Sequence, residues 1–532
     1  MDSYQNCMGC IDWKRCILKM KKITAILLSL LLAVPFLFSE NYQISDGIYD
    51  TKGNFRLTTT KVMNLKMNFP LDKKTIFDEE EFDAYIKNYA QELKNSRFFQ
   101  EIDVHWEPAG TNGDVTLVNV FVSVVDSNHF LAVPYASFKD DSTVTKVTPK
   151  IKAKDTNFLG TMNPLTADFN VEIKKEKSQD FWTFTPEFNI DYDYPFKAGI
   201  FDLTWVNSYG IEFHVGENLP EWNTKTGIKA VLPFDRVSLV LEEYIHFDRE
   251  RDYEIYGDAM YFQNQTIFST PISLYKFENF STLNYTPSVS FSIYWDFDII
   301  NPANESLKGP FITLSHSLSN SKINWNNNFR EGYSWSIKNS WPYNFHVREW
   351  SPSVSVEGLF FRYIKLEDRN YFDTIGLAVD LYAFTYFPLS HKKYDSSTSG
   401  YGEKIGGRIR GIADDTYFGN TAPEYTTSTA IVMNFDFPIN IVNTHFKHDI
   451  INFDMQFSPF MDIAIYRDRA LPLQTDSVIC AGMEVLVYPY KWSSFTIRAS
   501  IGFDLKSAIA ENNAIKGLLH NKEFSIGLGL HY

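Results

Sequence analysis

The sequence predicts a mainly β protein, a transmembrane antiparallel β-barrel preceded by one small α+β domain. Three observations indicate this class: a secretion signal, segments of about 10 alternating residues that repeat from residue 143 to the C-terminus, and aromatic residues near the segment ends. Aromatic residues make up 16% of the 532 residues, yet the mean hydropathy is only -0.24. No internal run approaches the roughly 20 apolar residues of a membrane-spanning helix, so the aromatic content does not come from such helices.

The secretion signal follows a short N-terminal extension. Met20 and two lysines precede an apolar run from Ile23 to Phe38, which is short for a membrane span and is followed at once by polar chain. We therefore expect a signal peptide at residues 20–39, with an uncleaved anchor helix as the alternative. Because a signal peptide begins near its own methionine, we interpret residues 1–19 as a wrongly assigned upstream extension.

Cysteine content and charge exclude several kinds of site. Cys7, Cys10 and Cys16 lie in the extension, which leaves Cys480 alone in the mature chain. A Cys-x-x-Cys pair occurs in redox and zinc elements, but a structural zinc site has four ligands, so we expect no metal, cofactor or disulfide. The net charge of -15 and the lack of a Lys/Arg cluster argue against a nucleic-acid partner.

Residues 42–130 predict the small α+β domain. Asp78 and Glu81 form a capping box, and an apolar stripe with helical spacing follows. Its members are Phe82, Tyr85, Ile86, Tyr89 and Leu93. After this helix come an alternating strand, a turn at PAGTNGD and a second strand at VTLVNVFVSVVD. The residues before the helix, 42–67, predict a first strand and a first helix.

Residues 143–532 predict the barrel. Apolar residues occupy one face of a segment that begins at Val289, and Ser or Asp occupies the other face. The apolar set is Val289, Phe291, Ile293, Trp295, Phe297 and Ile299. A soluble sandwich alternates in the same way, so this pattern alone does not separate the two folds. The secretion signal, the length of the repeated series and the aromatic residues at segment ends favour the transmembrane barrel.

The C-terminal sequence FSIGLGLHY also favours a barrel. Its apolar face carries Phe524, Ile526, Leu528, Leu530 and Tyr532. A chain that ends within a strand leaves an unpaired edge unless that strand closes a sheet. The segment resembles the C-terminal signal strand of bacterial outer-membrane proteins, which the assembly machinery reads. A soluble edge strand is the alternative.

Five stretches, in order along the chain, carry a family resemblance. They are ELKNSRFFQEIDV from Glu92; KDTNFLG, with Asp155, Asn157, Phe158 and Gly160; RIRGI, which is Arg408, Ile409, Arg410, Gly411 and Ile412; NFDFPI from Asn434; and FMDIA from Phe460. Together they resemble the outer-membrane assembly and translocation superfamily of BamA, TamA and the two-partner-secretion transporters, the bacterial surface antigen family. Four positions depart from the usual family residue, namely Ile412, Asn434, Asp436 and Ala464.

The resemblance implies a barrel of about 16 strands in the bacterial outer membrane and one polypeptide-transport-associated (POTRA) domain in the periplasm. KDTNFLG corresponds to the first strands of the barrel, and RIRGI to the tip of the sixth extracellular loop, where Arg410 pairs with Asp462. Alternation along NFDMQFSPFMDIAIY places Asp462 in the lumen. Gly407 and Gly411 would allow close backbone approach, and Arg408 would make a second contact. A solvated loop is the alternative, and a phosphate-binding loop is disfavoured because no helix start follows.

The expected function follows from the resemblance. It implies insertion of other barrels into the outer membrane, or passage of a polypeptide across it, with unfolded polypeptide clients, outer-membrane lipids, and periplasmic chaperones or accessory lipoproteins as partners. A passive pore for small solutes is the alternative. We do not expect an enzyme, because His445, His448 and His531 have no visible catalytic partners and no hydrolase or nucleotide motif is present.

Overall fold

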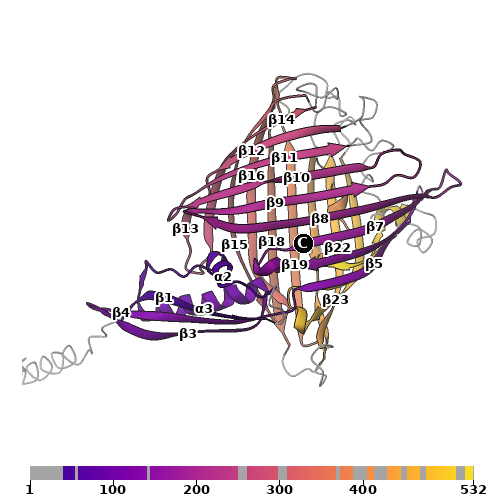
Figure 1. Cartoon of the computed structure of the whole chain (residues 1–532). Coiled ribbons are helices and arrows are strands. Elements are labelled where there is room, and N and C mark those ends of the chain that lie inside the picture. The colour runs from indigo at the N-terminus through magenta and orange to yellow at the C-terminus, as the bar shows by residue number, and fades with distance from the viewer. Residues whose placement is uncertain are drawn as a thin grey trace, which may run out of the picture. The chain divides into compact units, whose positions relative to one another are not determined.

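The computed structural model describes residues 40–53, 58–140, 144–249, 260–296, 308–366, 372–387, 403, 405–411, 428–444, 452–467, 475–510 and 522–530. The expected signal peptide, Ile412, Tyr532 and the three histidines considered above as catalytic candidates lie outside these residues. Strands account for most of the described chain (Figure 1). None of the described helices has the length and apolar character needed to cross a membrane.

The chain divides into two compact units. The described residues of the first are 40–48, 71–86 and 105–120; the second takes in the remaining described residues. Four strands near the N-terminus form a sheet in the order β2-β1-β4-β3. They are β1 (Asn41–Lys52), β2 (Ile76–Phe77), β3 (Phe99–Asn112) and β4 (Val115–Asp126), accompanied by helices α2 (Val62–Asn68) and α3 (Glu79–Ser96). The predicted small α+β arrangement is confirmed.

Helix α3 begins where its sequence predicts. The Glu81 backbone N–H donates to Asp78 Oδ1 at 2.8 Å, and the Asp78 backbone N–H donates to Glu81 Oε2 at 3.4 Å, so the two residues cap the helix reciprocally. The first part of the apolar stripe, as far as Ile86, is buried within the first unit. Phe82 stacks on Tyr42 at 5.2 Å between ring centroids and meets the edge of Trp106 at 5.5 Å. Burial of each such side chain contributes about 1.5 to 3 kcal/mol to folding.

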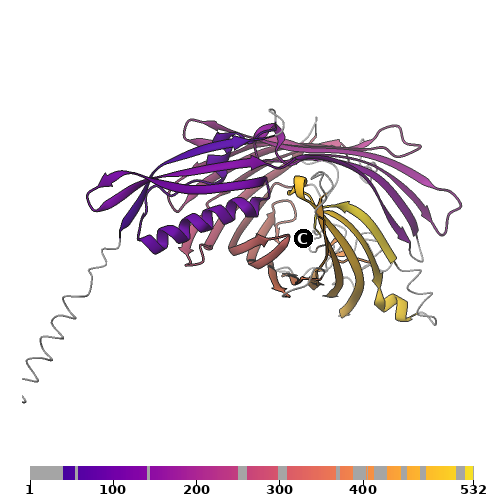
Figure 2. The ribbon, with the colours of Figure 1, turned by 90° about the horizontal axis from the view of Figure 1, so that it is seen from below.

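The second unit contains a closed antiparallel barrel, and in Figure 2 its strands follow one another around a ring. The strands are β5 (Phe130–Asp140), β6 (Val144–Asp155), β7 (Leu165–Glu176), β8 (Thr183–Ala198), β9 (Phe201–Glu212), β10 (Glu221–Pro233), β11 (Ser238–Arg249), β12 (Met260–Ser269), β13 (Ile272–Lys276), β14 (Thr282–Trp295), β15 (Phe311–Asn326), β16 (Phe329–Asn344), β17 (Glu349–Trp350), β18 (Ser353–Lys365), β19 (Thr374–Tyr386), β20 (Thr429–Asp436), β21 (Ile439–Asn443), β22 (Phe453–Arg467), β23 (Thr475–Pro489), β24 (Ile497–Asp504) and β25 (Lys522–Leu528). Short helical turns are η1 (Phe158–Gly160), η4 (Gly406–Arg408), η6 (Tyr490–Trp492) and α4 (Leu505–Ala510).

The barrel has eighteen strands in the described chain, two more than the resemblance implied. Three strands are interrupted: β12 and β13 both pair with β14, β17 and β18 both pair with β16, and β20 and β21 both pair with β22. Each interrupted pair counts as one strand. The additional strands precede the loop that carries RIRGI, so this is the seventh loop on its side of the barrel rather than the sixth.

The barrel also begins earlier than the predicted residue 143, because β5 starts at Phe130 and closes the sheet against β25. Its sequence, FLAVPYASFKD, has consecutive apolar residues and a proline, so it lacks the strict alternation that marks the later strands. The weak pattern explains why the boundary was placed too late.

Alternation along the strands places apolar side chains on the outer wall. Val289, Leu314 and Trp341 lie opposite one another on β14, β15 and β16 and are 36%, 43% and 40% exposed. On β22, Met461 is exposed whereas its neighbour Asp462 is fully buried. A band of exposed apolar side chains around a barrel with polar groups inside is the pattern of a lipid-facing wall.

Candidate functional site

The candidate site lies on the inner face of strands β19 to β25, where two rows of side chains run across the sheet. Strand register places Asp380, Asn434, Asp462, Cys480 and Asp504 in one row. The adjacent row contains Asp436, Phe460, Gly482, Gly502 and Glu523. The tip of the loop between β19 and β20 lies against these two rows.

Arg410 is the centre of the contact. Its Nε and Nη2 donate to the two carboxylate oxygens of Asp462 at 3.0 and 2.7 Å, and its backbone N–H donates to Asp462 Oδ2 at 2.8 Å. Nη1 and Nη2 donate to Asp436 at 2.7 and 3.3 Å. Nη1 also lies 3.3 Å from Glu484 Oε1, and the guanidinium stacks on Phe460 at 3.8 Å. The sequence thus identified one carboxylate partner of three.

The cluster is buried and strongly charged. Arg410 is 5% exposed, Asp462 is fully buried, and Asp436 and Glu484 are 6% and 3% exposed. Burial alone lowers the pKa of the Arg410 guanidinium, but hydrogen bonds and negative charge from Asp462 and Asp436 raise it above its usual range. The arginine therefore remains charged and offsets three carboxylates that would otherwise repel one another in a site of low dielectric.

Apolar contacts hold the loop next to this ion cluster. Ile405 and Ile409 are buried and pack against side chains from four neighbouring strands. These are Tyr382, Phe384, Ala430, Val432, Ala464, Tyr466, Val478 and Cys480. Ala464, where the sequence resemblance leads one to expect glycine, belongs to this cluster, and so does Cys480. The loop is thus fixed by hydrophobic packing on one side of Arg410 and by ion pairs on the other.

Gly411 lets the loop approach the last two strands. Its φ is +90°, and a Cβ at this position would lie 2.6 Å from the Phe503 backbone nitrogen. A Cβ on Gly502 would in turn lie 2.8 Å from Gly411, so both positions require glycine. The Gly411 N–H donates to Glu523 Oε2 at 2.9 Å. This hydrogen bond joins the loop tip to β25, the strand that closes the barrel.

The other two loop positions differ from each other in their contacts. Arg408 is partly exposed, lies 3.4 Å from Glu357 and stacks on Tyr382 at 3.5 Å. It makes the second contact that the sequence suggested. Gly407 has open space where a Cβ would be, so the expectation that it permits close approach is wrong.

The C-terminal segment follows the prediction only as far as Leu528. Phe524 is exposed, and Ile526 and Leu528 follow it on the same strand. At Gly529 φ is +99° and the N–H donates to the Thr496 carbonyl at 2.8 Å, which ends the strand. Leu530 then lines an inner cavity of about 40 Å³ with Glu484 and Tyr488. The prediction that Leu530 continues the apolar outer face is therefore wrong, because glycine redirects the chain.

KDTNFLG lies at the turn between β6 and β7 and holds the segment that precedes α2. Asn157 Nδ2 donates to the Thr58 carbonyl at 2.9 Å and to Thr60 Oγ1 at 2.8 Å, and Asn157 Oδ1 accepts the Met162 N–H at 2.7 Å. The Asn157 N–H donates to Asp155 Oδ1 at 2.9 Å. The motif thus organises its own turn and fixes a segment about 100 residues earlier in the chain.

The two other motif residues also lie at this turn. The Gly160 carbonyl accepts from the Lys61 N–H at 3.0 Å and from Asn64 Nδ2 at 2.9 Å, and a Cβ on Gly160 would clash with the Thr59 carbonyl. Phe158 meets the edge of the Tyr192 ring at 6.3 Å. These contacts explain why the motif contains glycine and an aromatic residue.

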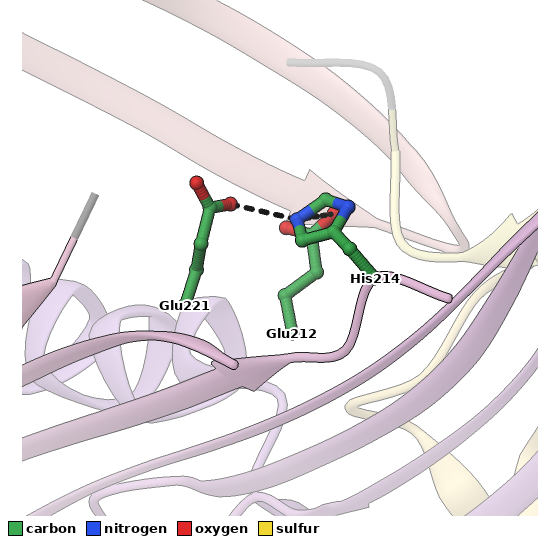
Figure 3. A group of neighbouring side chains, drawn as sticks. All are labelled: Glu212, His214 and Glu221. Carbon is green, nitrogen blue, oxygen red and sulfur yellow. Dashed lines mark hydrogen bonds and ion pairs between the residues drawn. The ribbon is translucent and has the colours of Figure 1, made fainter. Parts of the chain in front are cut away.

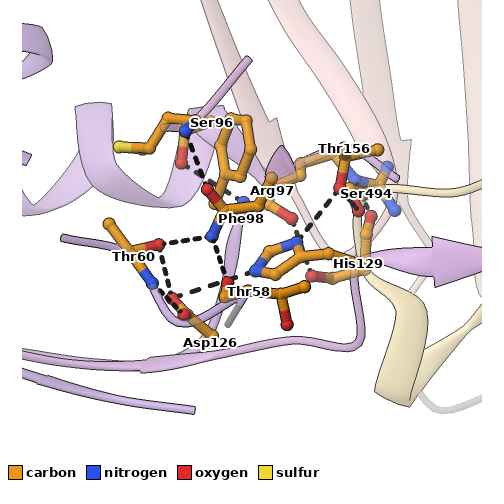
Figure 4. Close-up of polar contacts among 12 residues, drawn as sticks. Thr58, Thr60, Ser96, Arg97, Phe98, Asp126, His129, Thr156 and Ser494 are labelled. Atoms are coloured by element: carbon orange, nitrogen blue, oxygen red, sulfur yellow. Dashed lines mark hydrogen bonds and ion pairs between the residues drawn. The ribbon is translucent and has the colours of Figure 1, made fainter. Parts of the chain in front are cut away.

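A second polar network continues from this turn (Figure 4). Asp126 accepts the Thr60 N–H and hydroxyl at 2.7 and 2.8 Å. His129 Nδ1 lies 3.0 Å from the Thr156 hydroxyl, which lies 3.1 Å from Ser494. Burial lowers the pKa of Arg97 to about 10, so its guanidinium is charged at neutral pH. The network joins residues that lie far apart in the sequence at the strand ends next to α2.

Comparison with known proteins gives only distant structural similarities. No family model matches the sequence, and no curated protein matches it. CdiB from Acinetobacter baumannii is 12% identical, with a TM-score of 0.48, over 92% of this chain and 74% of that one. CdiB from Escherichia coli is 9% identical, with a TM-score of 0.43, over 92% of this chain and 77% of that one. BamA from Haemophilus ducreyi lacking POTRA domains 1–3 is 11% identical, with a TM-score of 0.36, over 92% of this chain and 85% of that one. The function is therefore argued from the geometry of this chain.

Proposed function

We propose that this protein is an outer-membrane barrel that inserts other barrel proteins into the bacterial outer membrane or translocates polypeptide across it. The observation that carries the proposal is the short pairing where the barrel closes. Among the described residues, β25 pairs with β5 only from Lys522 to Ser525 against Ser137 to Asp140. On its other side β5 pairs with β6 along its whole length.

On the seam side, residues 131–136 of β5 and 526–528 of β25 therefore face no partner strand in the described chain. An unpaired strand edge accepts an incoming strand by main-chain hydrogen bonds, which is the β-augmentation mode of peptide binding. A client strand would add at the seam, and folding of the client would supply the free energy, since no nucleotide is available in the periplasm.

The loop contact supports the same function. Its Arg410 cluster and the Gly411–Glu523 hydrogen bond fix the loop against the strands next to the seam. A loop held inside the barrel beside β25 positions the closing strand and occupies part of the lumen. Occupying the lumen is less suited to a passive solute pore, which is the alternative function.

The N-terminal sheet and helices would act as a periplasmic POTRA domain that presents clients to the barrel. Its partners would be unfolded outer-membrane or secreted polypeptides, together with outer-membrane lipids and periplasmic chaperones or accessory lipoproteins. The exposed apolar outer wall of the barrel supports placement in a membrane.

A disulfide across the seam tests this function. Ser137 and Ser525 are register partners, so the pair Ser137→Cys and Ser525→Cys can close the seam covalently under oxidising conditions. We expect client insertion or secretion to stop on oxidation and to return on reduction. The matched control is Ser500→Cys with Ser525→Cys, because these hydroxyls lie 2.8 Å apart across the neighbouring β24–β25 ladder. Full activity with a fully cross-linked seam would refute the proposal.

A further inference from the structure

Three potential metal ligands meet at the connection between β9 and β10 (Figure 3). Glu212 is the last residue of β9, Glu221 is the first of β10, and His214 lies in the loop between them. His214 Nε2 lies 2.9 Å from Glu221 Oε2 and 3.6 Å from Glu212 Oε1. All three ligand atoms lie within 4.8 Å of one another.

The carboxylates face each other across the sheet. Glu212 is the register partner of Glu221 on one side and of Glu187 on the other, so three glutamates form one cross-strand row. Like charges directly opposite each other destabilise a sheet. A cation bound at this row would remove that repulsion, and the nearby imidazole adds a nitrogen ligand that calcium and magnesium do not favour but zinc does.

The spacing of the three atoms suits a small ion. Zinc binds imidazole nitrogen and carboxylate oxygen at about 2.0 to 2.2 Å, which separates neighbouring ligand atoms by roughly 3.3 to 3.6 Å in tetrahedral geometry. The two distances from His214 Nε2 bracket this range. We propose that Glu212, His214 and Glu221 bind a divalent transition-metal ion, with zinc as the favoured ion.

A cavity of about 320 Å³ adjoins the Glu212 and Glu221 side chains and leaves room for a water molecule as a fourth ligand. Its lining includes the oxygen-bearing side chains of Glu187, Asn189, Asn223 and Asp248. The one cation in the lining is Arg249, whose Nη1 donates to the Leu219 and Pro220 carbonyls at 3.3 and 3.0 Å. The cavity wall is therefore acidic, which favours a bound cation.

The bound ion would tie the end of β9 to the start of β10 and close the loop of residues 213–220. Metal binding requires deprotonated carboxylates and a neutral imidazole, so it competes with protons. Affinity should therefore fall as the pH is lowered. The site is separate from the loop contact at Arg410 and from the seam, and it does not depend on the proposed client function.

Calorimetric titration of the purified, detergent-folded full chain with ZnCl₂ tests the site. We expect one ion to bind per chain. His214→Ala and Glu212→Gln should each weaken zinc binding by about 100-fold or more, since loss of a supporting contact alone weakens metal sites by about 10- to 100-fold. The control is His346→Ala, which removes an exposed histidine from the loop after β16 and should leave the affinity unchanged.

Cobalt gives an independent readout. Co²⁺ bound to the wild type should show visible absorption bands of a nitrogen and oxygen site of low coordination number, and His214→Ala should lose them. Heat-dependent gel migration establishes that each variant is folded. The proposal is overturned if zinc does not bind, if the two ligand variants bind it as tightly as the wild type, or if calcium or magnesium binds more tightly than zinc.

Discussion

Removal of the Arg410 side chain should destabilise the barrel more than removal of the Arg408 side chain from the same loop. In Arg410→Ala the backbone hydrogen bond to Asp462 remains, but the guanidinium contacts to Asp462, Asp436 and Glu484 are lost. Three buried carboxylates then face one another, and Arg498 lies 3.7 Å from Glu484. Breaking a buried ion pair by removing one partner costs about 3 to 5 kcal/mol, and we expect a loss in this range.

Asp462→Ala should have a smaller effect. Arg410 would keep its contacts with Asp436 and Glu484, so the loss should be about 1 to 3 kcal/mol, as for a buried hydrogen-bonded group. The double variant should lose less than the sum of the two single losses, because the two side chains interact directly. Arg408→Ala is the matched control in the same loop. Its partly exposed pair with Glu357 predicts a loss of at most about 1 kcal/mol.

The free energy of unfolding would be measured by urea titration of the lipid-reconstituted barrel, followed by tryptophan fluorescence. A difference of about 3 kcal/mol corresponds to more than a 100-fold change in the unfolding equilibrium constant, so the Arg410 and Arg408 variants are readily separated. Additive losses in the double variant, or equal losses for the Arg410 and Arg408 variants, would refute the buried ion cluster.

Three further predictions follow from the geometry and the sequence. Gly502→Val should release the loop tip and make it susceptible to added protease, whereas Gly358→Val, at a position with open space, should not; equal protease resistance would contradict the close approach. Asn157→Ala should lower the free energy of unfolding by about 2 to 3 kcal/mol, since it leaves buried groups without partners, and an unchanged urea midpoint would contradict this role. The mature chain should begin shortly after Ser39, and mass spectrometry that detects residues 1–19 in purified outer membranes would contradict both the start site and the cleavage.

Much of the fold could be predicted because single strands and helices carry their own pattern. The stripe of α3 and the alternation along β14 each follow from one stretch of sequence. The number of strands could not be predicted in this way. Interrupted strands such as β12 and β13 look like separate segments, and β5 has apolar residues on both faces. Strand number is a property of how the sheet closes rather than of any one segment.

Those parts of the candidate site that depend on the pattern of a single segment could be predicted from the sequence. The alternation of side chains along β22 places Asp462 in the lumen, and Gly411 marks a close backbone approach. The roles of Asp436, Glu484 and Glu523 depend on register across several strands, which the pattern of one strand does not contain. Asp436 shares its strand face with Ala430 and Val432, and Glu484 shares its face with Val478 and Cys480. Neither face is polar throughout, so the isolated carboxylates themselves were the available signal.

The most direct test of the account is depletion of this protein in the cell from which it comes, followed by quantitative proteomics of the outer membrane. We expect either a general fall in other barrel proteins, which identifies insertion, or the loss of one exported polypeptide, which identifies translocation. An unchanged set of outer-membrane and exported proteins, accompanied by a loss of small-solute uptake, would contradict the proposed function and identify a passive pore.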